Sequence, residues 1–130
     1  MSDYFSASGT ESNTPGQWVK PANLLALDMG EGVTFRPTLG QNLLVNHVEI
    51  TPQSHAARHH HEEEQIAYVL EGELDIEVSG DRRQLGPGEL VVIPSHAAHE
   101  VWTHEQGVTL IDIFAPPRQA LVSRMRSERS

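Results

Sequence analysis

Residues 58–72 read RHHHEEEQIAYVLEG, with three His and three Glu directly before an apolar run. The charged run alone is also compatible with a solvated turn or a weak nickel-binding tract. In a strand, alternate side chains share one face about 6 to 7 Å apart, so His59 and His61 would point the same way and His60 away. Both imidazoles could then reach one ion at about 2.1 Å. Gln65, at the start of the next strand, would add a neutral oxygen ligand beside them.

A second informative stretch, residues 88–103, reads GELVVIPSHAAHEVWT. Its strand meets Pro94, which cannot donate to a sheet ladder, and a short turn leads into a new strand that opens with His99. This position suits a fourth ligand. His96, in the turn before it, is expected to orient a ligand from behind.

Short apolar and β-branched runs, separated by Gly, Pro and charged turns, continue from Leu24 to Phe114. No convincing helix lies between them, which predicts an all-β antiparallel sandwich or barrel and not βαβ units. We expect residues 1–23 to form a polar tail or dimer arm and residues 24–118 to form a single barrel. Residues 119–130 are expected to form a peripheral C-terminal tail with one or two helical turns.

The composition argues against several classes of function. Nine Lys and Arg against 18 Asp and Glu give a formal net charge of −9, which would repel nucleic acids and anionic membranes. The chain has no Cys, so any metal must be held by His, carboxylate or amide groups. No apolar run approaches the roughly 20 residues of a transmembrane helix, and the first residues lack the pattern of a signal peptide. We therefore expect a cytoplasmic protein with a small-molecule substrate.

The two stretches together resemble the paired motifs of the cupin superfamily, in which a His-x-His, an acid and a Gly are matched by a Gly, a Pro and a later His. The matching residues are His59, His61, Gly72, Gly88, Pro94 and His99. Three positions depart from the pattern, because Gln65 replaces the usual Glu, His96 a second Gly and Thr103 a frequent Asn.

That resemblance implies a cupin jelly-roll β-barrel with a divalent transition metal in its mouth. The ion would be zinc, nickel, manganese or iron, and the implied ligands are His59, His61, Gln65 and His99. Dimers are common among similar proteins, and the open edges of a jelly roll give a physical reason to expect a homodimer.

A narrower similarity joins Gln65 and the closing segment IDIFAPPR to small cupins that open unsaturated uronates in pectin and alginate breakdown. By position, it implies catalytic roles for Asp112, Phe114 and Arg118. Strand alternation places Asp112 on an otherwise apolar face, where a buried carboxylate needs a partner or a purpose. A structural ion pair is the alternative for Asp112, and a surface salt bridge is the alternative for Arg118.

We therefore expect a metal-dependent isomerase or lyase whose ion polarises an oxygen of a carboxylate-bearing substrate. Asp112 would move a proton, and Arg118 would hold the carboxylate. Four neutral ligands leave the ion its full double charge, which favours a Lewis acid. Three alternatives stay open: a metal-dependent dioxygenase, a cyclase or isomerase of a secondary-metabolite pathway, and a non-catalytic protein that binds a small ligand.

Overall fold

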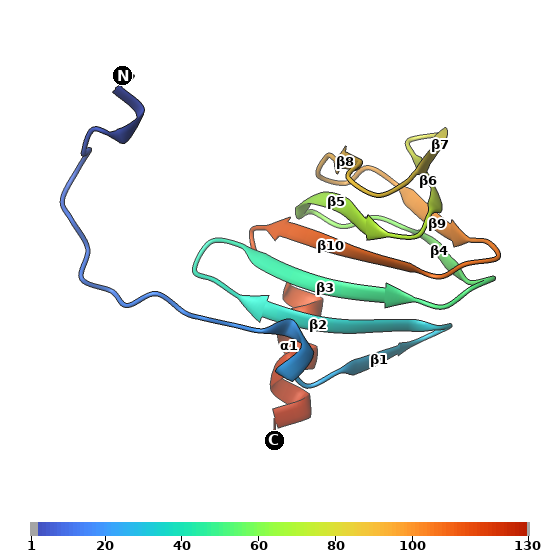
Figure 1. Ribbon diagram of the computed structural model, residues 1–130, viewed down its shortest axis with the longest axis horizontal. Coiled ribbons are helices and arrows are strands. Elements are labelled where there is room, and N and C mark those ends of the chain that lie inside the picture. Colours follow the sequence, from blue (N-terminus) through green and yellow to red (C-terminus); the bar gives the residue numbers. More distant parts are fainter. Residues whose placement is uncertain (1–2, 130) are drawn as a thin grey trace.

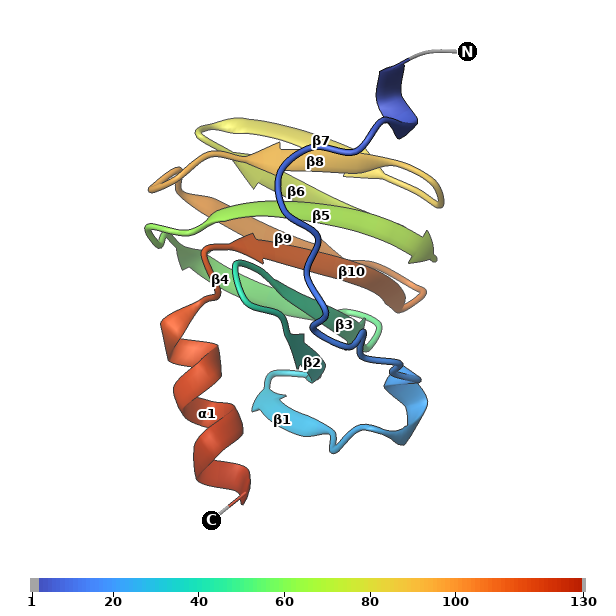
Figure 2. The same cartoon turned by 90° about the vertical axis from the view of Figure 1, so that its left-hand side faces the viewer.

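The computed structural model describes residues 3–129, which form two antiparallel sheets and a C-terminal helix (Figure 1). The larger sheet has the order β1 (Leu27–Gly30), β2 (Val33–Leu39), β3 (Leu44–Ile50), β10 (Val108–Ala115), β5 (Glu64–Glu71) and β8 (Leu90–Ile93). The smaller sheet has the order β4 (His55–His59), β9 (His99–Thr103), β6 (Leu74–Val78) and β7 (Asp81–Leu85). Figure 2 shows β9 and β4 behind β5, β10 and β3. The predicted all-β jelly roll is confirmed.

The alternation of side chains in β10 shows how the two sheets share a core. Its residues Val108, Leu110, Asp112 and Phe114 are buried, while those between them are only partly covered. Apolar residues of both sheets form the main core cluster, namely Val48, Ile50, Ala67, Val69, Leu74, Ile76, Ile93, Val108 and Leu110. Asp112 therefore interrupts an apolar, inward-facing stripe, as the period of the strand predicts.

Gly72 carries the chain from β5 in the larger sheet to β6 in the smaller one. Its φ of 77° lies in the left-handed region, and a Cβ there would lie 2.1 Å from the carbonyl oxygen of Gly107. Backbone conformation and close approach both require glycine at this position. The glycine of the first motif thus brings the two sheets together on one side of the barrel.

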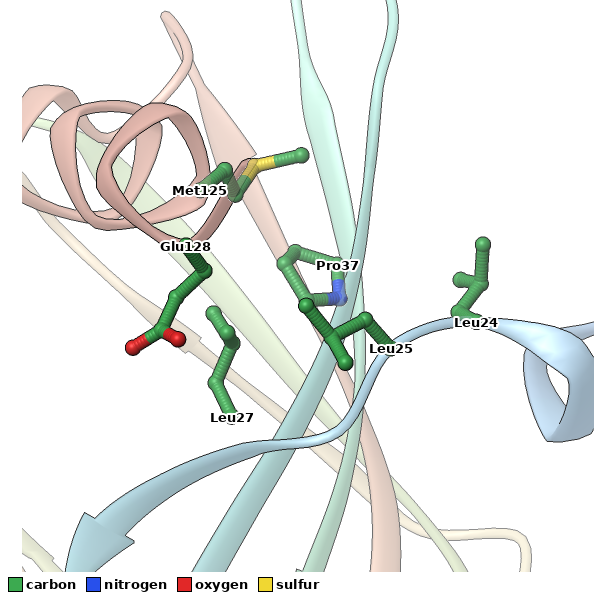
Figure 3. A pocket seen from close by; sticks show the side chains of 6 residues that line it. All are labelled: Leu24, Leu25, Leu27, Pro37, Met125 and Glu128. Carbon is green, nitrogen blue, oxygen red and sulfur yellow. The ribbon is translucent and has the colours of Figure 1, made fainter. Parts of the chain in front are cut away.

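The C-terminal segment differs from the expectation of one or two peripheral turns. It forms an 11-residue helix, α1 (Gln119–Arg129), and its Leu121 and Val122 are buried in a second cluster with Leu27, Leu44 and Phe114. The mostly polar composition of the segment predicts only short peripheral turns. That expectation is wrong because two adjacent apolar residues suffice to anchor a helix against an apolar strand end. A pocket of about 50 Å³ lies between this helix and the sheet, lined by Leu24, Leu25, Leu27, Pro37, Met125 and Glu128 (Figure 3).

The N-terminal segment contains two short 3-10 helices, η1 (Asp3–Phe5) and η2 (Pro21–Asn23). The chain between them is extended and runs away from the barrel (Figure 1). Trp18 in this stretch is 96% exposed. Among residues 3–129, no helix is both long and apolar enough to span a membrane.

Candidate metal centre

Three imidazoles meet at one end of the barrel, and all three belong to the predicted ligand set. His59 ends β4, His99 begins β9, and the two residues lie opposite each other in the antiparallel pair. The ring centroids of His59 and His99 are 4.2 Å apart, and those of His61 and His99 are 5.0 Å apart. One ring nitrogen from each residue lies within 4.8 Å of the other two, which is close enough for one ion to bind all three.

The three rings converge as expected, but not because His59 and His61 alternate along one strand. His61 does not alternate with His59 along a strand, because β4 ends at His59 and His61 lies in the loop that follows. The pairing of β4 with β9 is also irregular between Ala56 and His59. Loop geometry therefore turns His61 inward, while His60 is exposed and lies outside the group.

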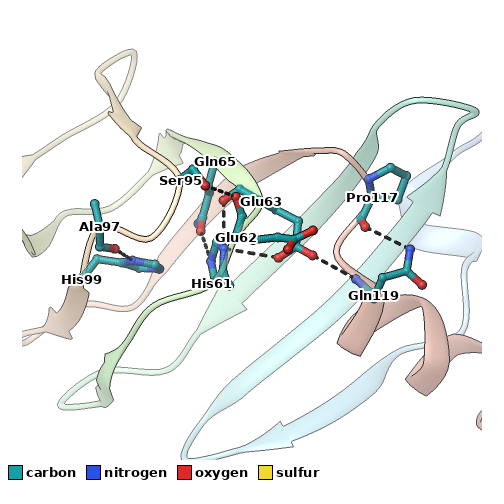
Figure 4. A network of polar contacts seen from close by, with 9 residues as sticks. All are labelled: His61, Glu62, Glu63, Gln65, Ser95, Ala97, His99, Pro117 and Gln119. Atoms are coloured by element: carbon teal, nitrogen blue, oxygen red, sulfur yellow. Dashed lines mark hydrogen bonds and ion pairs between the residues drawn. The ribbon is translucent and has the colours of Figure 1, made fainter.

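The three rings are held by the same kind of hydrogen bond. Each Nδ1 contacts the backbone carbonyl oxygen of a residue two positions away: His59 with Ala57 at 2.8 Å, His61 with Glu63 at 2.9 Å and His99 with Ala97 at 2.9 Å. Figure 4 shows the His61 and His99 contacts. A carbonyl oxygen only accepts, so Nδ1 carries the proton in each ring. Each Nε2 is thereby left with a free lone pair, the form in which His binds a metal.

Burial favours the neutral form of two of these rings. It lowers the pKa of His99 to about 4, and it lowers the pKa of His61, where the charge of Arg118 acts in the same direction. Nε2 of His99 is buried and has no hydrogen-bond partner. A buried lone pair without a donor is unfavourable in itself, and a metal ion would satisfy it.

Gln65 could supply a fourth donor atom beside the three imidazoles. This residue is 7% exposed, and its Nε2 donates to Oδ1 of Asp112 at 2.9 Å. Its Oε1 is thereby turned toward Nε2 of His61, 3.1 Å away. With the His61 proton on Nδ1, both of these atoms offer lone pairs, and a shared cation would make their contact favourable. The donor set of three imidazoles and one amide oxygen therefore fits a divalent transition metal.

Asp112 and Arg118 lie beside this donor set. Burial raises the pKa of Asp112 to about 7, although the Gln65 hydrogen bond and the charge of Arg118 act against the shift. Within residues 3–129, neither side chain forms the ion pair that would give it a purely structural role. Nε of Arg118 is buried without a hydrogen-bond partner, and its guanidinium carbon lies 5.8 Å from the ring centre of Phe114. Arg118 therefore has an unused donor, whereas Asp112 already accepts one hydrogen bond, from Gln65.

A cavity of about 80 Å³ lies inside the barrel next to these groups. Its polar lining consists of His59, Gln65, His99, Asp112 and Arg118. The remaining walls are mostly apolar and come from both sheets, with Phe35, Ile76 and Leu110 among them. Two imidazoles, an amide, a carboxyl group and a guanidinium thus surround one space.

Two buried polar residues near the site were missed by the sequence analysis. Glu63, the middle of the three Glu, is 6% exposed, and Asn46 is fully buried beside Asp112 in the neighbouring strand. The alternation of β3 could have placed Asn46 inward, whereas nothing in the charged run distinguishes Glu63 from its neighbours. His96 differs from expectation, since its backbone N–H, and not its exposed imidazole, donates to the carbonyl oxygen of His61 at 2.8 Å.

Residues 46–114, more than half of the chain, match the family described as Cupin domain, and the protein therefore belongs to the cupin family. It is similar to the Pectin degradation protein KdgF of Dickeya dadantii (strain 3937), with 29% identity over 93 residues that cover 70% of this chain and 84% of that protein. The broad and the narrower resemblance drawn from the sequence are both confirmed.

Solved structures agree with this assignment. The structure of KdgF from Halomonas sp. matches with a TM-score of 0.77 and 27% identity, covering 82% of this chain and 99% of that one. An RmlC-like cupin from Shewanella frigidimarina NCIMB 400 matches with a TM-score of 0.76 and 24% identity over 82% of this chain and 96% of its own, a likeness that concerns the fold.

Proposed function

We propose that this protein is a metal-dependent enzyme that opens the ring of an unsaturated uronate, or of a similar carboxylate-bearing sugar acid, to a keto acid. One observation carries the proposal: three members of the neutral metal-binding set (His59, Gln65 and His99), a buried carboxyl group and an unpaired guanidinium line the same cavity. The similarity to two KdgF proteins, one of them named for pectin degradation, supports this choice of substrate.

The metal would be held by His59, His61 and His99, whose ring nitrogens lie close together, and by Gln65, whose Oε1 lies 3.1 Å from Nε2 of His61. Zinc, nickel, manganese and iron all suit these donors. Bound there, the ion would supply Lewis-acid chemistry with its full double charge, because none of the four ligands is anionic.

Arg118 would bind the substrate carboxylate. A guanidinium forms two parallel hydrogen bonds with a carboxylate, and Arg118 has a buried Nε without a partner in the cavity wall. Phe114 would support this geometry, because its ring centre lies 5.8 Å from the guanidinium carbon and 5.6 Å from the ring centre of His61. Phe114 would therefore fix the distance between the carboxylate-binding group and the metal-binding group.

Asp112 would move the proton. Ring opening of this kind is an isomerisation, in which a hydroxyl proton is released as the ring C–O bond breaks and a proton returns to carbon as the enol becomes a ketone. A carboxyl group with a pKa of about 7 can take and return a proton at neutral pH. The hydrogen bond from Gln65 would hold Oδ1 of Asp112 next to the metal-binding set.

The test is to incubate untagged, metal-loaded protein with an unsaturated uronate and to follow the loss of the double bond by absorbance and the keto acid by NMR. We expect turnover that disappears after chelation and returns with added metal. Oxygen uptake by iron-loaded protein without uronate turnover would instead support the dioxygenase alternative. Tight binding of the uronate without any product would support a non-catalytic binding protein.

We further propose that the chain assembles as a homodimer. Four large apolar side chains of β5 and β8 are exposed, namely Tyr68, Leu70, Leu90 and Val92. Tyr68 and Leu90 are register partners, so these residues form one apolar area at the edge of the larger sheet. Sedimentation of the parent and of Leu90→Glu tests this, since a parent that sediments as a monomer would contradict it. The cytoplasmic location stays a prediction, which cell fractionation can check.

A further inference from the structure

The three consecutive Glu residues after the His run differ sharply in burial. Glu62 and Glu64 are exposed, whereas Glu63 is only 6% exposed. Burying a carboxylate is unfavourable unless its oxygens find partners. The position of Glu63 in the loop before β5 therefore calls for a physical reason, which its two neighbours do not need.

Glu63 contacts a metal-binding ring on one side. Its backbone carbonyl oxygen accepts the Nδ1 proton of His61 at 2.9 Å, and its Oε1 lies 3.5 Å from the same nitrogen (Figure 4). Both contacts favour the His61 tautomer whose Nε2 is free to bind a metal. The negative charge beside Nδ1 also makes the ring a stronger donor, because ligand basicity rises when a carboxylate faces the far nitrogen.

On its other side, Glu63 contacts the start of the C-terminal helix. Oε2 accepts the backbone N–H of Gln119, the first residue of α1, at 3.3 Å (Figure 4). The first N–H groups of a helix lack partners within the helix, and a negative charge is favourable at this end. Arg118 directly precedes this residue, and the buried Leu121 of the same helix packs in one cluster with Phe114.

We infer that Glu63 is a positioning residue that holds the His61 ring for metal binding and links it to the N-terminus of α1, and so to Arg118. The inference rests on the proposed function only in that His61 binds a metal. The helix α1 offers no atom to the metal, but it is connected to the site through Glu63. The Glu63 carboxylate fixes the His61 ring relative to the start of α1, which follows Arg118, the residue proposed to bind the substrate carboxylate.

The test compares zinc binding to the metal-free, untagged parent with binding to three matched variants, Glu63→Gln, Glu62→Gln and Glu64→Gln, by calorimetry. Glu63→Gln keeps the shape and an acceptor oxygen but removes the charge, so we expect zinc affinity to fall about 10- to 100-fold. The two exposed positions should change it less than about 2-fold, since water and salt screen the charge of an exposed carboxylate. The melting temperature of the metal-free protein separates a positioning effect from a loss of fold.

A second variant, Gln119→Pro, removes the N–H that Glu63 accepts, while proline is well tolerated at the first position of a helix. We expect weaker zinc binding than in the parent and a higher KM for the carboxylate-bearing substrate, with the helix retained by circular dichroism. Parent-like zinc binding in Glu63→Gln would overturn this inference and leave the proposed function intact. If the parent itself bound no zinc, nickel, manganese or iron, the proposed metal site and the inference would both be wrong.

Discussion

Histidines in the barrel mouth and on the outer face of the smaller sheet make opposite kinds of contact. In the mouth, Nδ1 of each metal-binding candidate donates to a neutral backbone carbonyl. On the outer face, Nε2 of His55 contacts Glu100, and Nε2 of His104 lies 3.1 Å from Asp75. A carbonyl fixes the tautomer and leaves one lone pair free, whereas a carboxylate engages Nε2 itself. The ring nitrogen that is engaged, and not the number of histidines, separates a candidate ligand from a surface ion pair: Nδ1 in the mouth and Nε2 on the outer face.

The largest expected effect is on metal content, when one histidine of the mouth and one of the outer face are each replaced by alanine. His99→Ala removes a buried candidate ligand, so metal content should fall from about one ion per chain to near zero after dialysis. His104→Ala removes a carboxylate-bound ring and should leave the metal content unchanged. Elemental analysis of both untagged variants measures this. Equal losses in the two would mean that the histidines act as a loose tract, and the contrast between the two regions would be lost.

The next effect concerns catalysis without metal loss. Asp112→Asn keeps the size of the side chain and should retain the metal and the fold, while turnover falls about 100-fold or more, the usual scale for a general acid or base. Initial rates with an unsaturated uronate, alongside metal analysis, provide the measurement. A variant with parent-like turnover and a lower melting temperature would show that the carboxyl group is structural.

Gln65→Glu should move two quantities in opposite directions. Metal affinity should be kept or raised, because the new carboxylate is attracted to the ion, and substrate activation should weaken, because one unit of its charge is cancelled. The variant also loses the N–H that Gln65 donates to Asp112 and brings two carboxyl groups together, which raises the pKa of one of them. Titration calorimetry and turnover on one preparation test this, and if neither changes, Gln65 does not contact the metal.

The last comparison distinguishes the two regions by the pH dependence of stability, and its smallest effect is that of Asp75. In the metal-free protein, burial raises the pKa of Asp112 from 3.8 to about 7, so its ionised form destabilises the fold above that pH and Asp112→Asn should be the more stable protein there. The His104 hydrogen bond, helped by Arg82, instead lowers the pKa of Asp75 below 3.8. Asp75→Asn should therefore be less stable than the parent at neutral pH, by under about 1 kcal/mol.

Both differences should vanish in acid, since the parent carboxyl groups are then protonated like the neutral Asn. For Asp112 the change falls between pH 7 and 3.8, and for Asp75 it falls below 3.8. Urea unfolding at several pH values measures both. If Asp112→Asn and Asp75→Asn were both more stable, or both less stable, than the parent at neutral pH, the opposite pKa shifts of Asp112 and Asp75 would be contradicted.

Local spacing was sufficient to predict part of this site. A period of two places Asp112 on the inner face of β10, and the two motif blocks bring His59 and His99 to facing strands. The orientation of His61 and the burial of Glu63 depend on a loop and on the start of a distant helix, which no local period encodes. For the same reason the length of α1 was underestimated, because its anchoring residues acquire an apolar partner only once Phe114 is in place.

The two tryptophans of the chain lie in contrasting surroundings, which makes intrinsic fluorescence a reporter of the N-terminal segment. Trp102 stacks on His55 with ring centroids 5.4 Å apart, and the guanidinium carbon of Arg82 lies 3.8 Å from its ring centre. Trp18, at 96% exposure, has almost its whole indole in water. In Trp102→Phe the emission therefore comes from Trp18 alone, and a blue shift with rising protein concentration would reveal that a second copy covers this segment.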